Sequence, residues 1–71
     1  MNEDRIVKLI QMELTTDQLK LESELERIIN SNLETNKKIT KIKDILGKLV
    51  TIEASLIKFI TLTSGTNNNP N

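Results

Sequence analysis

The stretch IKDILGKLVTIEASLIKF, residues 42–59, decides the fold of this 71-residue chain. Its apolar residues form two interleaved series that each repeat every seven residues: Ile42, Leu49 and Leu56 in one, and Ile45, Ile52 and Phe59 in the other. Such a repeat marks the a and d positions of a coiled-coil helix, which pack against a neighbouring helix. We therefore predict that this stretch is helical and that a second helix covers its seam.

A second segment with helical character comes earlier in the chain. Residues 2–30 contain no Gly or Pro, and their apolar stripe consists of Val7, Leu14, Leu21 and Ile28, with Ile10 and Leu25 on the same face. This pattern predicts an amphipathic helix over about residues 2–30. The adjacent β-branched residues Thr15 and Thr16 weaken the helix locally, so a kink there is one alternative.

The polar run from Asn30 to Asn36 separates the two segments. Its Asn, Ser and Thr side chains compete with the helix for backbone hydrogen bonds, so we expect a turn over about residues 31–35. Ser31 and Glu34 have the spacing of a capping box, and Thr35 or Asn36 are alternative caps for a second helix over about 36–62. Residues 64–71 contain Gly, Pro and an Asn tract. We predict a disordered tail there.

A short connection between two long helices favours an antiparallel pair. The charges favour the same arrangement, because the first segment is net acidic and the second net basic. Folding back brings three acidic residues of the first helix alongside three basic residues of the second: Glu22, Glu24 and Glu26 alongside Lys38, Lys41 and Lys43. The predicted fold is all-α: an antiparallel two-helix coiled-coil hairpin over residues 1–63, followed by the tail.

The composition argues against several classes of function. The chain has no His or Cys, which removes the commonest general base and the usual soft metal ligands. Its 10 Lys and Arg balance 10 Asp and Glu, and Phe59 is its single aromatic residue, so direct binding to nucleic acid is disfavoured. Lys48, Glu53 and Lys58 interrupt the most apolar stretch and argue against a membrane span. We expect no enzymatic activity and no cofactor or metal.

Apolar residues remain once the seam is assigned. On the second helix they are Leu46, Val50, Ile57 and Ile60, and on the first they are Leu9, Met12 and Leu19. We interpret both groups as surfaces that bind a partner helix or a second copy of the chain. Scattered exposed apolar residues of no special role are the alternative.

The segment ERIINSNLETNKKI, residues 26–39, together with the Lys- and Ile-rich helix after it, resembles the phyllogens, small secreted phytoplasma effectors that convert flowers into leaf-like organs. The resemblance covers about residues 5–62 and rests on pattern, length and composition. It implies a two-helix antiparallel coiled coil that engages the keratin-like domain of floral MADS transcription factors. It also implies that these factors reach the proteasome through a ubiquitin-shuttle protein.

The same resemblance implies secretion from the bacterium into the host plant cell. No signal peptide is visible at Met1, where Asn2, Glu3 and Asp4 replace the expected basic residues. Secretion would therefore require that the signal has already been removed, and a cytoplasmic location is the alternative. The alternative function is a small structural subunit of a larger coiled-coil assembly or tethering complex.

Overall fold

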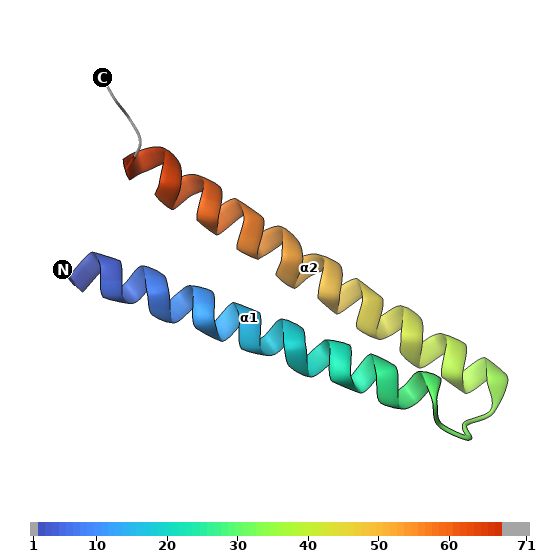
Figure 1. Ribbon diagram of the computed structural model, residues 1–71. Helices are drawn as coiled ribbons and strands as arrows, with labels where there is room; N and C mark the ends of the chain where they lie inside the picture. Colours follow the sequence, from blue (N-terminus) through green and yellow to red (C-terminus); the bar gives the residue numbers. More distant parts are fainter. Residues whose placement is uncertain (1, 68–71) are drawn as a thin grey trace.

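The protein folds into two long helices joined by a short turn (Figure 1). The structure is a computed structural model that describes the backbone of residues 2–67 and the side-chain environment of residues 4–64. Helix α1 spans Asn2–Ile29 and helix α2 spans Thr35–Asn67. The chain reverses between them, so the two helices run antiparallel and their free ends lie at the same end of the molecule (Figure 1). The predicted all-α hairpin is confirmed.

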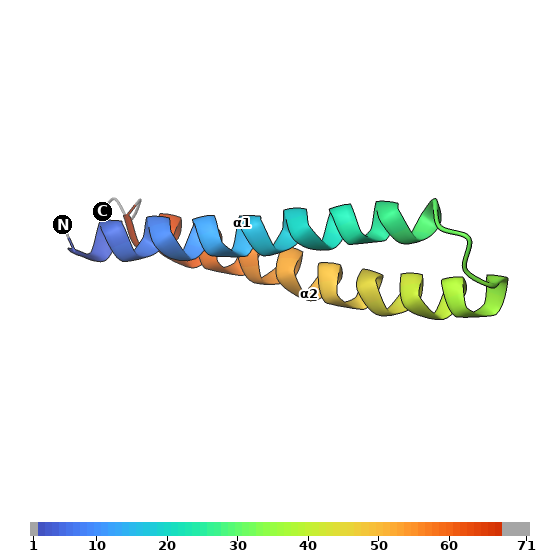
Figure 2. The same cartoon turned by 90° about the horizontal axis from the view of Figure 1, so that it is seen from below.

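The two helices contact each other, and their relative position changes along the hairpin. Figure 1 shows α2 beside α1 at the free ends, whereas in Figure 2, seen from below, the helices overlap there and lie apart near the turn. This change of relative position along the length is the behaviour of a coiled coil. Helix α1 passes through Thr15 and Thr16 without a break, so the alternative of a sharp kink is not realised.

The covered side chains of each helix alternate at spacings of three and four residues. In α1 they are Val7, Gln11, Leu14, Gln18, Leu21, Leu25 and Ile28, and in α2 they are Lys38, Ile42, Ile45, Leu49, Ile52, Leu56, Phe59 and Thr63. All six seam positions predicted in α2 are among them. The alternation keeps one stripe of each helix facing its neighbour over the whole length.

One predicted position of the α1 stripe is wrong. Ile10 is 37% exposed, and the seam position beside it is taken by Gln11. The seam positions of α1 are spaced four and then three residues apart, so the position between Val7 and Leu14 is residue 11 and not residue 10. The long aliphatic stem of glutamine can pack in the seam while its amide reaches the edge.

The core is concentrated near the turn. Ile28, Ile45 and Leu49 are the buried apolar residues of the described chain, at 8%, 4% and 6% exposure, and the partly buried residues packed against them are Leu21, Leu25 and Ile42. Burying such a side chain is worth about 1.5–3 kcal/mol. Three of them make a small core for a chain that must also offset the entropy of ordering two long helices.

Ser31 and Lys38 hold the turn together. The Ser31 hydroxyl donates to the Ile28 carbonyl at 2.7 Å and accepts from the Leu33 amide at 3.4 Å. The Lys38 ammonium donates to the carbonyls of Ile29 at 3.1 Å and Ser31 at 2.8 Å. These bonds satisfy the carbonyls of Ile28 and Ile29 at the end of α1, which have no partner within the helix, and the Ser31 carbonyl in the turn. The described residues include none with positive φ, so this turn needs no glycine.

The capping expected from the sequence is therefore replaced by a different one. Ser31 caps the end of α1 rather than the start of α2, which begins at Thr35 with the Lys38 amide donating to the Glu34 carbonyl at 2.8 Å. Lys38 likewise binds backbone carbonyls instead of an acidic side chain. Among the described residues, Asp44 and Lys48 of α2 form an ion pair at 3.5 Å, and no ion pair joins the two helices.

Helix α2 is longer than predicted. It continues beyond Leu62 and through Gly65 to Asn67, so the predicted tail begins too early. Glycine lowers helix stability by only about 1 kcal/mol relative to alanine, and the proline that would end the helix comes later, at position 70. The Thr63 hydroxyl also donates back to the Phe59 carbonyl at 2.9 Å. The rest of the predicted tail, residues 68–71, lies outside the described residues.

Placing a charge in the core tests the seam. Leu49→Lys should unfold the hairpin, with a loss of about 3 kcal/mol or more, because it leaves an unpaired ammonium among buried residues. Circular dichroism should then show loss of helicity at room temperature. Thr51→Lys is the matched control, since Thr51 is exposed and lies outside both the seam and the apolar residues beside it, and it should keep its helicity. Equal melting curves for the two variants would contradict the seam.

Removing the Lys38 ammonium tests the turn. Lys38→Ala should cost about 1 kcal/mol and lower Tm by several degrees, because the Ile29 carbonyl at the end of α1 and the Ser31 carbonyl in the turn lose their charged donor. Lys37→Ala, one residue away on an exposed position, should change Tm much less. The measurement is thermal melting of both variants at equal concentration. A larger effect at Lys37 would contradict the capping role of Lys38.

Candidate partner-binding face

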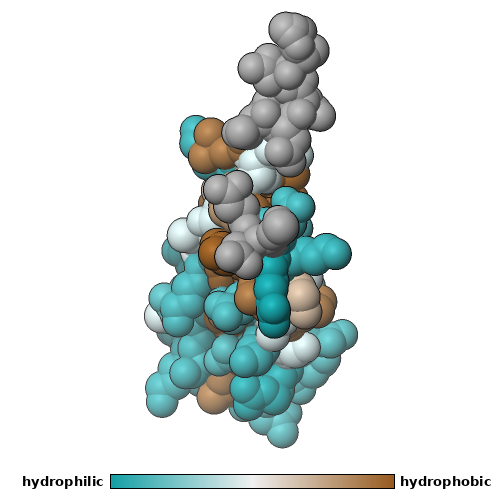
Figure 3. All heavy atoms as spheres, turned by 90° about the vertical axis from the view of Figure 1, so that its left-hand side faces the viewer, coloured by the Kyte–Doolittle hydropathy of each residue, from teal (hydrophilic) through white to brown (hydrophobic). Residues whose placement is uncertain are grey.

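Helix α2 carries a second apolar stripe beside its seam. The four residues predicted from the sequence are exposed, Val50 and Ile57 most of all at 64% and 67%, and Ile39 joins them. We call Ile39, Leu46, Val50, Ile57 and Ile60 the α2 stripe. Their spacing alternates like a heptad seam, with Lys43 and Glu53 at the two polar positions of the series. Figure 3, viewed towards the free ends, shows hydrophobic residues at the surface among hydrophilic ones.

The α2 stripe lies about a quarter of a turn around α2 from the seam, at 100° per residue. It therefore does not face α1 but points sideways from the plane of the hairpin. A hydrogen bond shows on which side of the hairpin the stripe lies: the Glu53 carboxylate, within the stripe, accepts from the Gln18 amide of α1 at 3.2 Å. The stripe thus borders the side of the groove between the helices on which Gln18 projects.

A polar cluster interrupts this side of the hairpin. The Gln18 side-chain amide donates to Glu22 at 3.4 Å as well as to Glu53 at 3.2 Å, so one amide joins two carboxylates. All three side chains are described, and no lysine or arginine of the described chain forms an ion pair with either carboxylate. The cluster is an acidic point beside an apolar stripe, and it would attract a cation from a binding partner.

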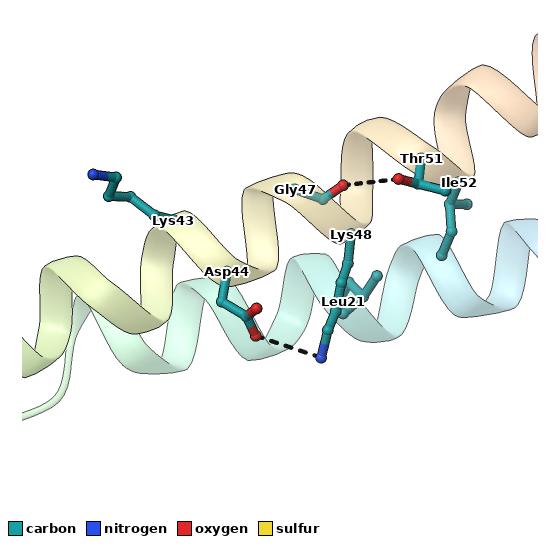
Figure 4. A pocket seen from close by; sticks show the side chains of 7 residues that line it. All are labelled: Leu21, Lys43, Asp44, Gly47, Lys48, Thr51 and Ile52. Carbon is teal, nitrogen blue, oxygen red and sulfur yellow. Dashed lines mark hydrogen bonds and ion pairs between the residues drawn. The ribbon is translucent and has the colours of Figure 1, made fainter.

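An open groove runs beside α2, and the residues that line it include Gly47 and Lys43, one of the two polar positions of the α2 stripe (Figure 4). Leu21 and Ile52 contribute its apolar wall, and the Asp44–Lys48 ion pair lies at its edge. The Thr51 hydroxyl donates to the Gly47 carbonyl at 3.1 Å. Figure 4 also shows the Lys43 side chain extending away from the hairpin. The groove is too open to enclose a small molecule.

Gly47 has no packing role within the hairpin. A Cβ atom added at this position would meet no atom within 4 Å beyond its local helix backbone. The residue lies in the interior of α2, where glycine is less favourable than alanine by about 1 kcal/mol. No contact inside the described chain explains this cost.

The predicted residues of α1 are exposed too, but the structure does not bring them together with the α2 stripe. Leu9, Met12 and Leu19 lie on the far side of α1 from its seam. With Thr16 they border shallow hollows, whose rims also contain charged side chains: Glu13, Asp17, Lys20, Glu24 and Arg27. This α1 group is a separate and more polar surface.

The polar cluster of Gln18, Glu22 and Glu53 was not predicted from the sequence. Gln18 occupies a seam position, so continuing the alternation of three and four residues along α1 would have located it. One hydrogen bond of the Gln18 amide joins consecutive turns of α1, and the other joins α1 to α2. Locating the cluster therefore requires the register of one helix against the other. Sequence spacing within one helix does not give that register.

Neither a metal site nor a membrane span emerges from the described residues. No group of three or more His, Cys, Asp or Glu in that part of the chain is arranged to hold a metal ion. None of its helices combines the length and apolar character needed to cross a bilayer. Comparisons of the chain with protein-family models, curated proteins and solved structures found no match. The resemblance to phyllogens therefore stays a prediction.

Proposed function

We propose that this protein is a non-enzymatic binding module that docks helical partners on the α2 stripe. The observation that carries the proposal is the exposure of five large apolar side chains on one face of a helix whose seam is already occupied. Exposed apolar residues gathered on one helix face and bordered by polar ones are a common mark of a protein interface. A helix with heptad spacing presents it in the form that another helix can pack against.

The energetics favour occupation of this face. Among the residues whose side chains the structure describes, the hairpin alone buries three that are apolar, all towards the turn. A partner helix would cover side chains such as Val50 and Ile57, at about 25 cal/mol for each Å² of apolar surface removed from water. The acidic cluster at Glu22 and Glu53 selects a partner with a basic residue at that level. Apolar contacts would thus supply affinity, and the charge would set the register.

The resemblance to phyllogens supplies the identity of the proposed partner. On that basis, the protein is an effector, secreted into the plant cell, that engages the keratin-like domain of floral MADS transcription factors and promotes their degradation through a proteasome shuttle protein. A coiled-coil target fits the α2 stripe, which presents apolar knobs at regular spacing with a charged rim. The α1 group of Leu9, Met12 and Leu19 is a second candidate surface for a partner.

A charge on the α2 stripe tests the proposal. Ile57→Lys should retain helicity, because Ile57 is exposed, and should weaken partner binding by about tenfold or more, since the ammonium must lose water at the interface. The measurement is a pull-down of a purified floral keratin-like domain together with circular dichroism of the variant. Thr61→Lys is the matched control, an exposed position of α2 outside the stripe, and should bind like the original protein.

The outcomes separate the two levels of the proposal. Full binding by Ile57→Lys would remove the α2 stripe as the docking face. Failure of the unmodified protein to bind floral MADS factors, in a pull-down from floral extract, would remove the effector role. An isolated chain that is unfolded or insoluble would instead favour the permanent structural subunit, since such a subunit gains its stability from its partners.

A further inference from the structure

We propose that the α2 stripe also joins two copies of this chain into a twofold dimer, in which α2 packs antiparallel against α2 and Lys43 of each copy meets Glu53 of the other. The inference rests on the proposed function, because it uses the same stripe. It adds that a second copy of the chain covers the stripe when no other partner is present. It follows from the order of residues along the stripe, from the unpaired charges and from Gly47.

The stripe is complementary to itself when one copy is reversed. In antiparallel helix packing, a positions lie opposite d positions. With Leu46 set opposite Val50 of the second copy, the same register sets Ile39 opposite Ile57 of the second copy. The two polar positions of the stripe, Lys43 and Glu53, then fall opposite each other in both halves. Each apolar residue from 39 to 57 meets an apolar residue, and each charge meets its opposite.

Other alignments lose this match. A parallel pair sets Lys43 against Lys43 and Glu53 against Glu53, and like charges at an interface cost several kcal/mol. An antiparallel pair shifted by one heptad in one direction sets Glu53 against Val50. A shift in the other direction sets Lys43 against Leu46. Burial of an unpaired charge against an apolar residue is unfavourable, so one register is selected.

The hairpin leaves the charges of this pair without an ionic partner. The Lys43 side chain forms no hydrogen bond or ion pair within the described chain and extends away from the hairpin (Figure 4). Glu53 shares the single Gln18 amide with Glu22, and no lysine or arginine of the described chain forms an ion pair with either carboxylate. Lys43 of a second copy reaches this point in the proposed register and supplies the missing positive charge.

Gly47 gives independent support. Its surroundings are empty within the hairpin, although a glycine in a helix interior costs stability. In the proposed register Gly47 lies next to the twofold axis, beside Gly47 of the second copy, and Thr40 lies beside Ala54 of the second copy. Small residues at these positions let the two backbones approach closely. The dimer thus gives Gly47 the packing role that the single hairpin lacks.

The dimer also enlarges a small core. Two stripes that are exposed in the hairpin would pack together next to the seams and form a four-helix arrangement with the two α2 helices in contact. Domains of this size often gain stability by oligomerisation, because one short chain buries little apolar surface. The free ends of the helices, where the seam is less covered, would benefit least.

Charge reversal tests the pairing. In sedimentation equilibrium, the full chain should be a dimer, and Lys43→Glu or Glu53→Lys should each raise the dimer Kd by about tenfold or more, because both then place like charges together. The double variant restores opposite charges across both pairs, so its Kd should return to within about threefold of the original. Lys58→Glu, on an exposed position outside the stripe, is the matched control.

Gly47→Gln tests the close approach of the two α2 backbones. A role of Gly47 within the single hairpin would change helicity, whereas a role at the dimer interface changes the dimer Kd. Glutamine is a better helix former than glycine, and a Cβ atom at this position meets no atom within 4 Å, so helicity at low concentration should be retained or increased. The dimer Kd should nevertheless rise by about tenfold or more, because the side chain separates the two backbones. Unchanged dimerisation would overturn the proposed approach at Gly47.

A monomer at all concentrations up to about 1 mM would overturn the inference. So would a double variant that dimerises no better than the single ones. A protein that is monomeric alone but binds a keratin-like domain would leave the proposed function intact. Conversely, a dimer that follows the charge-reversal pattern but binds no such domain would support this inference and remove the effector role.

Discussion

The packing of Ile45 and Leu49 of α2 against Ile28 of α1 is the contact on which the rest of the structure depends. It lies next to the turn, where Ser31 and Lys38 close the end of α1 and bring the two helices together. Once this end is fixed, the helices also pack together towards their free ends, because the heptad spacing keeps successive seam residues on the same side of each helix. Covering of the seam decreases away from the turn, since the hairpin holds its helices together at one end only.

Helix α2 has two distinct roles in this arrangement. Its seam is used for folding, and the stripe beside it remains exposed although it has the same heptad character. A two-helix hairpin cannot cover both, because one neighbouring helix occupies only one side of α2. The exposed stripe and Gly47 belong to α2, and the acidic cluster joins Glu53 of α2 to Gln18 and Glu22 of α1. Function in this protein is therefore best sought on α2, with the more polar α1 group as a second surface.

Much of the fold was predictable because it depends on local and periodic features. The absence of Gly and Pro from residues 2–30, the heptads around Leu49 and the polar segment at the turn indicated two helices and their antiparallel pairing. The exposed stripe was predictable too, as an excess of apolar residues over one seam. The exact boundaries were less so: the second helix extends to Asn67, and Gln11 rather than Ile10 enters the seam. Helix ends and single seam positions depend on differences of about 1 kcal/mol that composition does not resolve.

By itself, the sequence determined that this chain forms two amphipathic helices with more apolar surface than they can cover, because hydrophobic periodicity is a property of order along one chain. Only the tertiary structure decided which groups from different helices meet. It placed Gln18 between Glu22 and Glu53, turned Lys38 from an expected ion pair to the carbonyls of the turn, and left Gly47 without a neighbour. Each of these depends on the register and rotation of one helix against the other. That relation is set by packing across the seam, which no spacing within a single helix contains.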